Sequence, residues 1–153
     1  MPDLNAGSKV KGLDTPPPVD DAQAGQFTFT VTSYGVATTG GTYADCGVAF
    51  VAPTTGRVKI SVAAVLVNST AGVGTLISPV VREGGTIGSG TTVKAATDND
   101  CLQVNGTSGM RTSVFVMVEG LTPGDTYNVR LEHRVTANTG TATRRYVLVE
   151  PLT

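Results

Sequence analysis

Histidine, cysteine and clustered carboxylates are the side chains with which a small domain could do chemistry, and this sequence of 153 residues holds few of them. Its one histidine is His133. Acyl transfer needs a histidine beside a nucleophile and an orienting acid, and no segment carries the G-x-S-x-G pattern of a nucleophile elbow. His133 alternates with apolar residues along a strand-like segment, so we expect a packed, hydrogen-bonded side chain rather than a catalyst.

The two cysteines, Cys46 and Cys101, are expected to be buried thiols. Two cysteines are too few for the disulfide framework of a small secreted domain, and a reducing cytoplasm keeps thiols free while the chain folds. A reactive thiolate needs an electropositive setting, which the sequence around them does not show. Free cysteine is among the most often buried residue types, so we expect both to pack as small apolar side chains. The sequence leaves open whether they pair.

Asp98, Asn99 and Asp100 are the best candidates for a metal site, because closely spaced carboxylate and amide oxygens suit Ca²⁺. They lack the fuller pattern of an EF-hand loop, so we expect a polar turn between strands. The glycine-rich stretch 84–90 lacks the Lys-Ser/Thr ending of a phosphate-binding loop and precedes no helix, so we expect a flexible loop. We therefore expect no catalytic residue, no metal, no cofactor and no enzymatic activity.

Arg144 and Arg145 follow each other in a strand-like segment, so their side chains should point to opposite faces. One of them is a candidate for a buried or interfacial ion pair, with Glu119 or Glu132 as the partner. The alternative is that each is a solvated surface charge.

The elements that must position these residues are strands. The chain is rich in threonine and valine, contains 19 glycines and is only 15% charged, which favours an all-β protein. No stretch sustains a helical apolar pattern beyond about a turn. Segments with a period of two alternate with turn residues and predict eight or nine strands; these include 27–31, 46–52, 57–67, 76–82, 91–95, 101–104, 111–118, 125–136 and 143–149. The turn at 53–56 predicts a hairpin between the strands on either side of it.

The segment 111–118 is apolar on both faces. Phe115 and Met117 alternate with Val114, Val116 and Val118, so a strand here has the core behind it and a second buried surface in front. We expect this outer face to be a subunit interface of a homotrimer, with Val114, Phe115, Val116 and Met117 as the interface residues. The alternative is a central strand that the protein's own loops cover.

The first 25 residues differ from the rest of the chain. Three consecutive prolines enforce an extended path, and isolated apolar residues are too few to form a core. We expect residues 1–25 to be an anchoring arm that becomes ordered on a partner, and residues 26–153 to be the sandwich domain. The docking residues of this arm are expected to be Leu4, Val10, Leu13, Pro16, Pro17, Pro18 and Val19.

Charge and hydropathy exclude several partners. A formal net charge of −1 argues against nucleic acid, because binding to phosphates needs clustered cations. The beginning of the chain has no apolar run behind a basic start, and no stretch approaches about twenty apolar residues. We therefore expect a soluble protein that is made in the cytoplasm and binds neither nucleic acid nor membrane.

Three passages carry a resemblance to a known family: MPDLNAGSKVKGLDTPPPVDD, CGVAFVAPTTGRVKISV and VEGLTPGDTYNVRLEHRVTANTGTATRRYVLVEPLT. They resemble small virion proteins of tailed phages of actinobacteria, which are known as head-decoration or minor tail proteins. The resemblance spans most of the chain. It implies a jelly-roll-like antiparallel β-sandwich of about eight strands, trimeric and anchored to the particle by the N-terminal arm. It brings no catalytic or metal-binding residues.

A second fold remains open. The passage LTPGDTYNV, residues 121–129, also resembles the tyrosine corner of fibronectin type III domains, in which a tyrosine hydroxyl ties a strand to the turn before it. Those domains usually have a core tryptophan, and this chain has none. An immunoglobulin- or fibronectin-like sandwich is therefore the alternative to the jelly roll.

Three functions from different classes follow. The first is a decoration protein that binds the major capsid protein on the particle exterior, which would place the chain in the virion. The second is a minor tail or fibre protein that binds a host surface glycan through the loops 72–75 and 84–90. The third is a hydrolase of envelope polymers, which would need paired carboxylates in a cleft.

Overall fold

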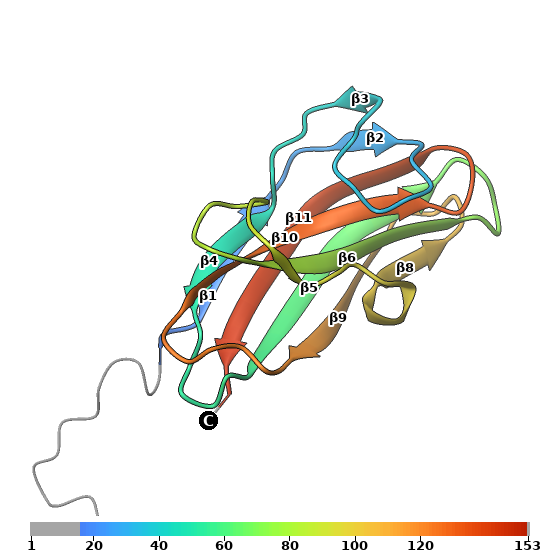
Figure 1. Cartoon of the computed structure of the whole chain (residues 1–153). Helices are drawn as coiled ribbons and strands as arrows, with labels where there is room; N and C mark the ends of the chain where they lie inside the picture. Colours follow the sequence, from blue (N-terminus) through green and yellow to red (C-terminus); the bar gives the residue numbers. More distant parts are fainter. Residues whose placement is uncertain (1–15, 153) are drawn as a thin grey trace, which may run out of the picture.

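Residues 16–152, which the computed structural model describes, are organised as two antiparallel β-sheets that face each other across a common apolar core (Figure 1). The first sheet has the strand order β3-β2-β11-β5-β9. β1 also pairs with β11, further along that strand than β2. Its strands are β1 (Val19–Gln23), β2 (Phe27–Phe29), β3 (Gly40–Gly41), β5 (Val58–Asn68), β9 (Met110–Val118) and β11 (Gly140–Pro151).

The second sheet has the order β4-β10-β6-β7, with β8 also paired to β6. Its strands are β4 (Gly47–Val51), β6 (Gly74–Glu83), β7 (Thr92–Lys94), β8 (Leu102–Asn105) and β10 (Thr126–Val135). In the described part of the chain, one short 3₁₀ turn, η1 (Asp98–Asp100), lies between β7 and β8. No helix among these residues is long and apolar enough to cross a membrane.

The order of the strands is that of a jelly roll. Counting β1 with β2 as one interrupted strand and β7 with β8 as another, and leaving out the two-residue strand β3, gives eight main strands. In this count the first sheet has the order 1-8-3-6 and the second 2-7-4-5. The first strand therefore pairs with the last, as two Greek keys require. An immunoglobulin-like sandwich instead pairs its first two strands, so the alternative fold is excluded.

Strict alternation explains why β5 forms the centre of the first sheet. Its even-numbered residues from Val58 to Asn68 are buried and its odd-numbered residues are half-buried. A period of two places alternate side chains on opposite faces, so one face of β5 builds the core. The apolar residues of this face belong to the same core cluster as those of β10, where Tyr127, Val129 and Leu131 are buried. The alternation in the sequence thus predicted these strands correctly.

The expected hairpin at the turn 53–56 is wrong, although the turn itself forms. Gly56 donates its N–H to the carbonyl oxygen of Pro53 at 2.9 Å, with φ at 64°. A side chain at Gly56 would bring a Cβ within 2.4 Å of the Leu121 carbonyl oxygen. The strands on either side do not pair, because β4 joins β10 in one sheet and β5 joins β11 and β9 in the other. The turn therefore carries the chain between the layers.

The expected boundary at residue 25 also needs correction. Residues 19–23 form strand β1 and pair antiparallel with β11, from Val19 opposite Val149 to Gln23 opposite Arg145. Val19 packs against the core. The sandwich therefore begins no later than Val19, and the part of the arm that precedes residue 16 lies outside the described residues.

Candidate functional site

The seven docking residues expected from the sequence fall into two groups. Leu4, Val10 and Leu13 lie outside the described residues. Pro16 is half-buried, Pro17 and Pro18 are exposed, and Val19 is the first residue of β1. The proline run therefore leads directly into a strand that is held in the sheet.

The four expected interface residues lie on β9 and alternate between its two faces. Phe115 and Met117 are 63% and 42% exposed and form the outer surface of the first sheet. Val116 is buried and Val114 is half-buried against the core, so these two do not belong to an accessible surface. β9 is also the edge of its sheet rather than a central strand, and none of the described loops buries Phe115 or Met117 on its outer face.

The polar face of β10 is the structural feature that the sequence did not predict. Asn128, Arg130, Glu132 and Arg134 alternate with the buried apolar residues, a pattern typical of a solvent-exposed face. Asn128 is nevertheless fully buried and Glu132 is 7% exposed. Asn128 and Arg134 bind segments from elsewhere in the chain that fold over this face, and Glu132 binds two arginines, one of its own strand and one of β6.

Asn128 holds the glycine-rich loop between β6 and β7. Its Nδ2 donates to the carbonyl oxygens of Gly84 and Ser89, at 2.9 and 3.1 Å, and its Oδ1 accepts from the Gly88 N–H at 2.9 Å. One buried amide thus satisfies backbone groups at both ends of the loop at 84–90, which the sequence led us to expect to be flexible. Arg130 packs beneath the same loop, where a Cβ on Gly88 would lie 2.2 Å from its Nη1.

Glu132 is the centre of a half-buried charge cluster. Its Oε1 accepts from Arg82 at 2.8 Å and from Arg130 at 2.9 Å. Burial raises the pKa of this carboxyl, but hydrogen bonds from the two guanidinium groups outweigh burial and lower the pKa overall. Glu132 was one expected partner of Arg144 or Arg145, and it binds neither. Glu119, the other, binds Arg57 at 2.8 Å.

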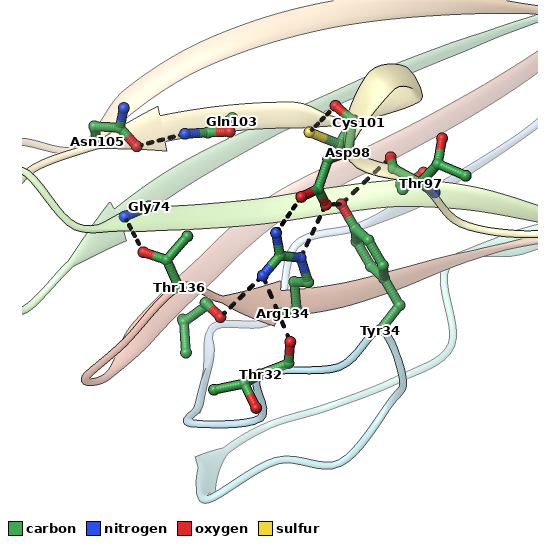
Figure 2. A network of polar contacts seen from close by, with 12 residues as sticks. Thr32, Tyr34, Gly74, Thr97, Asp98, Cys101, Gln103, Asn105, Arg134 and Thr136 are labelled. Carbon is green, nitrogen blue, oxygen red and sulfur yellow. Dashed lines mark hydrogen bonds and ion pairs between the residues drawn. The ribbon is translucent and has the colours of Figure 1, made fainter.

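Arg134 joins three segments at one end of the second sheet, as Figure 2 shows. Its guanidinium binds both carboxylate oxygens of Asp98, with Nε at 3.0 Å from Oδ1, and its Nη1 donates weakly to the Thr32 carbonyl oxygen. Tyr34 donates its hydroxyl to Asp98 at 2.9 Å, and its ring lies 5.4 Å from the guanidinium carbon. The Arg134 guanidinium holds the pKa of Asp98 below its usual range.

The candidate metal site at 98–100 is a turn whose two carboxylates form ion pairs with basic side chains of the protein. Asp98 binds Arg134, and Asp100 binds Lys94. Within residues 16–152, no three His, Cys, Asp or Glu side chains gather as metal ligands would. The expectation of a polar turn at this place is therefore met by the structure.

His133 is enclosed, as its position on the apolar face predicted. It is 1% exposed, and its Nε2 lies 2.9 Å from the Ala37 carbonyl oxygen, which makes Nε2 the donor. The rings of Phe27, Phe29 and Tyr43 surround it at centroid distances of 4.9, 4.2 and 6.0 Å. Burial lowers the pKa of His133, so the ring is neutral near pH 7.

Arg145 shares this aromatic cluster and forms no ion pair with a described carboxylate. Its guanidinium carbon lies 4.5 Å from the centroid of Phe27 and 5.1 Å from that of Tyr43, and Nη2 donates to the Ala44 carbonyl oxygen at 2.8 Å. Arg144 is exposed and lies at a β-bulge with φ at 51°. The bulge explains how two consecutive arginines reach such different surroundings.

Both cysteines are free thiols, but only one is buried as expected. Cys46 is fully buried, and burial raises the pKa of its thiol to about 12. Cys101 is half-buried, with its Sγ 3.1 Å from the Asp98 carbonyl oxygen, and its pKa is also raised. Neither thiol has the lowered pKa of a nucleophile.

Comparison with known proteins relates the chain to others by shape alone. No family model matches it, and no curated protein matches it. Among solved structures, the VP2 subviral particle of infectious bursal disease virus matches with a TM-score of 0.49 and 15% identity over 90% of this chain and 33% of VP2. The Gx strain of the same virus gives 0.47 and 14% over 88% of this chain and 32% of the matched chain.

A pilus protein of Bacillus endospore appendages, a family of disulfide-linked pili, gives a TM-score of 0.35 and 17% identity over 98% of this chain and 100% of that chain. This chain spans about a third of the length of the two viral chains. Sequence identities at this level are informative about the fold alone. The strand order already establishes that fold as an antiparallel jelly-roll sandwich.

Proposed function

We propose that this chain is a non-enzymatic structural protein of a phage virion, a decoration protein that binds the capsid exterior through its N-terminal arm and stabilises the particle. The resemblance in sequence names the class of protein. The partner in this proposal is the phage major capsid protein, and the site of contact is the arm that precedes β1.

The observation that carries the proposal is the way in which the arm joins the sandwich. Pro16, Pro17 and Pro18 restrict the chain immediately before β1, which lowers the entropy lost when the arm is fixed on a partner. β1 then pairs over five consecutive residues with β11, the longest strand of the fold. The arm is therefore connected to a central strand of the first sheet. Such a connection is suited to linking a compact domain to a larger surface.

A second candidate is a minor tail or fibre protein that binds the host surface, with a glycan as ligand. The glycine-rich loop at 84–90 supports it, because Asn128 holds this loop in one conformation before any ligand arrives. Preorganisation of this kind reduces the cost of binding.

The test is incorporation of the protein into particles assembled without it. Protein that lacks residues 1–15 should keep the melting temperature of the full chain and should fail to bind the particles, because residues 16–152 contain both sheets and the core between them. The matched control is Asn128→Ala in the full chain, which loosens the loop at 84–90 and leaves the arm intact. Normal incorporation of the deleted protein would overturn the proposal, and host binding that only Asn128→Ala abolishes would favour the second candidate.

A further inference from the structure

Strand β9 leaves a long open edge on the sandwich. It ends the first sheet and pairs with β5 on one side, and none of the described residues pairs with it on the other. It has nine residues, whereas the other strands with an open edge have two to five: β1 and β4 have five, β8 has four, β7 has three and β3 has two. Short edge strands are one means by which proteins prevent pairing with other chains. β9 is too long to be protected in this way.

The 3₁₀ turn η1 lies near β9, but β9 lacks the protections that its own sequence and pairing could provide. Its pairing with β5 runs from Val118 opposite Val58 to Met110 opposite Leu66 without a bulge. Its sequence, MRTSVFVMV, contains no proline and no lysine, and Arg111 is its one charged residue. Its outer face exposes Phe115 and Met117. An open, regular and apolar edge of this length is a template for a further strand.

The register with β5 tells which residues of β9 point their backbone groups outward. The Arg57 carbonyl oxygen accepts from Leu152, on the β11 side of β5, and the Gly56 carbonyl oxygen accepts from Leu121, on the β9 side. Successive residues of a strand direct their N–H and C=O groups to opposite edges, so even-numbered residues of β5 face β9. By the register, even-numbered residues of β9 face back, and the odd-numbered residues from Arg111 to Met117 offer their groups to a partner.

We infer that this partner is the β9 of a second copy, paired antiparallel about a twofold axis at Phe115. The two Phe115 residues then lie opposite each other, and Ser113 lies opposite Met117 of the partner. Arg111 lies opposite Glu119 of the partner on both sides of the axis. The two first sheets become one continuous sheet, and the exposed rings and thioethers cover each other.

Charge complementarity selects this register. Among residues 16–152 no carboxylate binds Arg111, whose one polar contact is the Arg144 carbonyl oxygen at 3.3 Å. Glu119 is exposed and binds Arg57 on one side, which leaves carboxylate lone pairs for a second guanidinium. An axis one residue earlier, at Val114, would place Arg111 opposite Met117 and leave the charge unpaired. The axis at Phe115 is the register that pairs both charges and uses the whole edge.

The pairing is independent of the proposed virion role, and it gives a dimer in which this edge is used once per chain. In this arrangement the edge is not available for the threefold contact that the sequence led us to expect for the same surface. Light scattering on the full chain over micromolar concentrations should report two chains. Phe115→Asp should raise the dissociation constant by about 30-fold or more, because it removes a central contact and opposes two carboxylates. Val93→Asp is the matched control, because Val93 is 44% exposed on the three-residue strand β7, and it should leave the dimer unchanged.

A cross-linking experiment tests the register. Ser113→Cys and Met117→Cys are made separately in a Cys101→Ser background, which leaves Cys46 as the one native thiol, fully buried. Directly opposed residues of such a pair have Cα atoms about 5.5 Å apart, within the range for a disulfide. Mixing the two proteins under oxidation should give a covalent dimer, and neither protein alone should do so. A monomer, a trimer, or a dimer that does not cross-link in the mixture would overturn the inference.

Discussion

The hydroxyl of Tyr127 accepts a hydrogen bond from the backbone N–H of Thr122 at 3.0 Å, which ties the start of β10 to the turn five residues before it. This is the geometry of a tyrosine corner, in a sandwich that does not have the immunoglobulin strand order. The local motif and the topology are therefore separate properties of this chain. Tyr127 is 4% exposed, so the bond is screened from water.

Tyr127→Phe should lower the free energy of unfolding by about 1–2 kcal/mol, because the ring remains and the Thr122 N–H loses its partner. Urea denaturation followed by circular dichroism measures this change. Thr122→Ala keeps the backbone N–H and should change stability by less than about 0.5 kcal/mol. Equal stability of Tyr127→Phe and the native chain would show that the hydrogen bond adds nothing to folding.

Asn128→Ala should destabilise the fold by roughly 2–4 kcal/mol, since it leaves three loop backbone groups without their partner. Amide exchange of residues 84–90 should become faster through local opening, and core amides that exchange through global unfolding should become faster in line with the loss of stability. Asn105→Ala is the control, because Asn105 is an exposed amide that accepts from Gln103. Unchanged exchange in the loop would contradict the anchoring role of Asn128.

Stability should fall as the pH drops below about 6.5, because the pKa of His133 is lowered by burial from the value of 6.5 that an exposed histidine has. The unfolded chain then binds a proton that the folded chain excludes, so the contribution is present above pH 6.5 and is lost below it. One such group gives a slope of at most about 1.4 kcal/mol per pH unit. The lowered pKa values of Glu132, Asp98 and Asp100 act only at lower pH.

Urea unfolding at pH 7.5 and pH 5.5 measures this slope. His133→Gln removes the titrating group, and although it lowers stability at both pH values, the difference between them should shrink. A slope that is the same in His133→Gln and in the native chain would assign it to another group.

Deletions at the N-terminus should separate the arm from the first strand. Removing residues 1–15 should leave the melting temperature nearly unchanged. Removing residues 1–23 should cost at least about 2 kcal/mol, because it removes the pairing of β1 with β11 and exposes the core contact of Val19. Chemical denaturation of both variants measures the difference. Equal stability of the two would place the boundary of the folded domain where the sequence first put it, near residue 25.

Much of this protein follows from its sequence, because alternation has a direct geometric meaning in a strand. A period of two assigns side chains to two faces, and this was sufficient to predict the burial of His133 and to place Val116 and Phe115 on opposite faces of their strand. Turn residues at 53–56 marked the end of one strand and the start of the next. The all-β class and most strand positions depend on local residues alone, and they were predicted correctly.

The tertiary structure decided what these local rules leave open. Alternation does not say which strand pairs with which, so the chain crosses between the sheets at Gly56 where a hairpin was expected. It did not show that Asn128 and Glu132 are buried, because the residues that they bind come from distant parts of the chain. The cause is the same in both cases. Sheet membership and the covering of a face depend on contacts between residues far apart in sequence, and no local pattern records them.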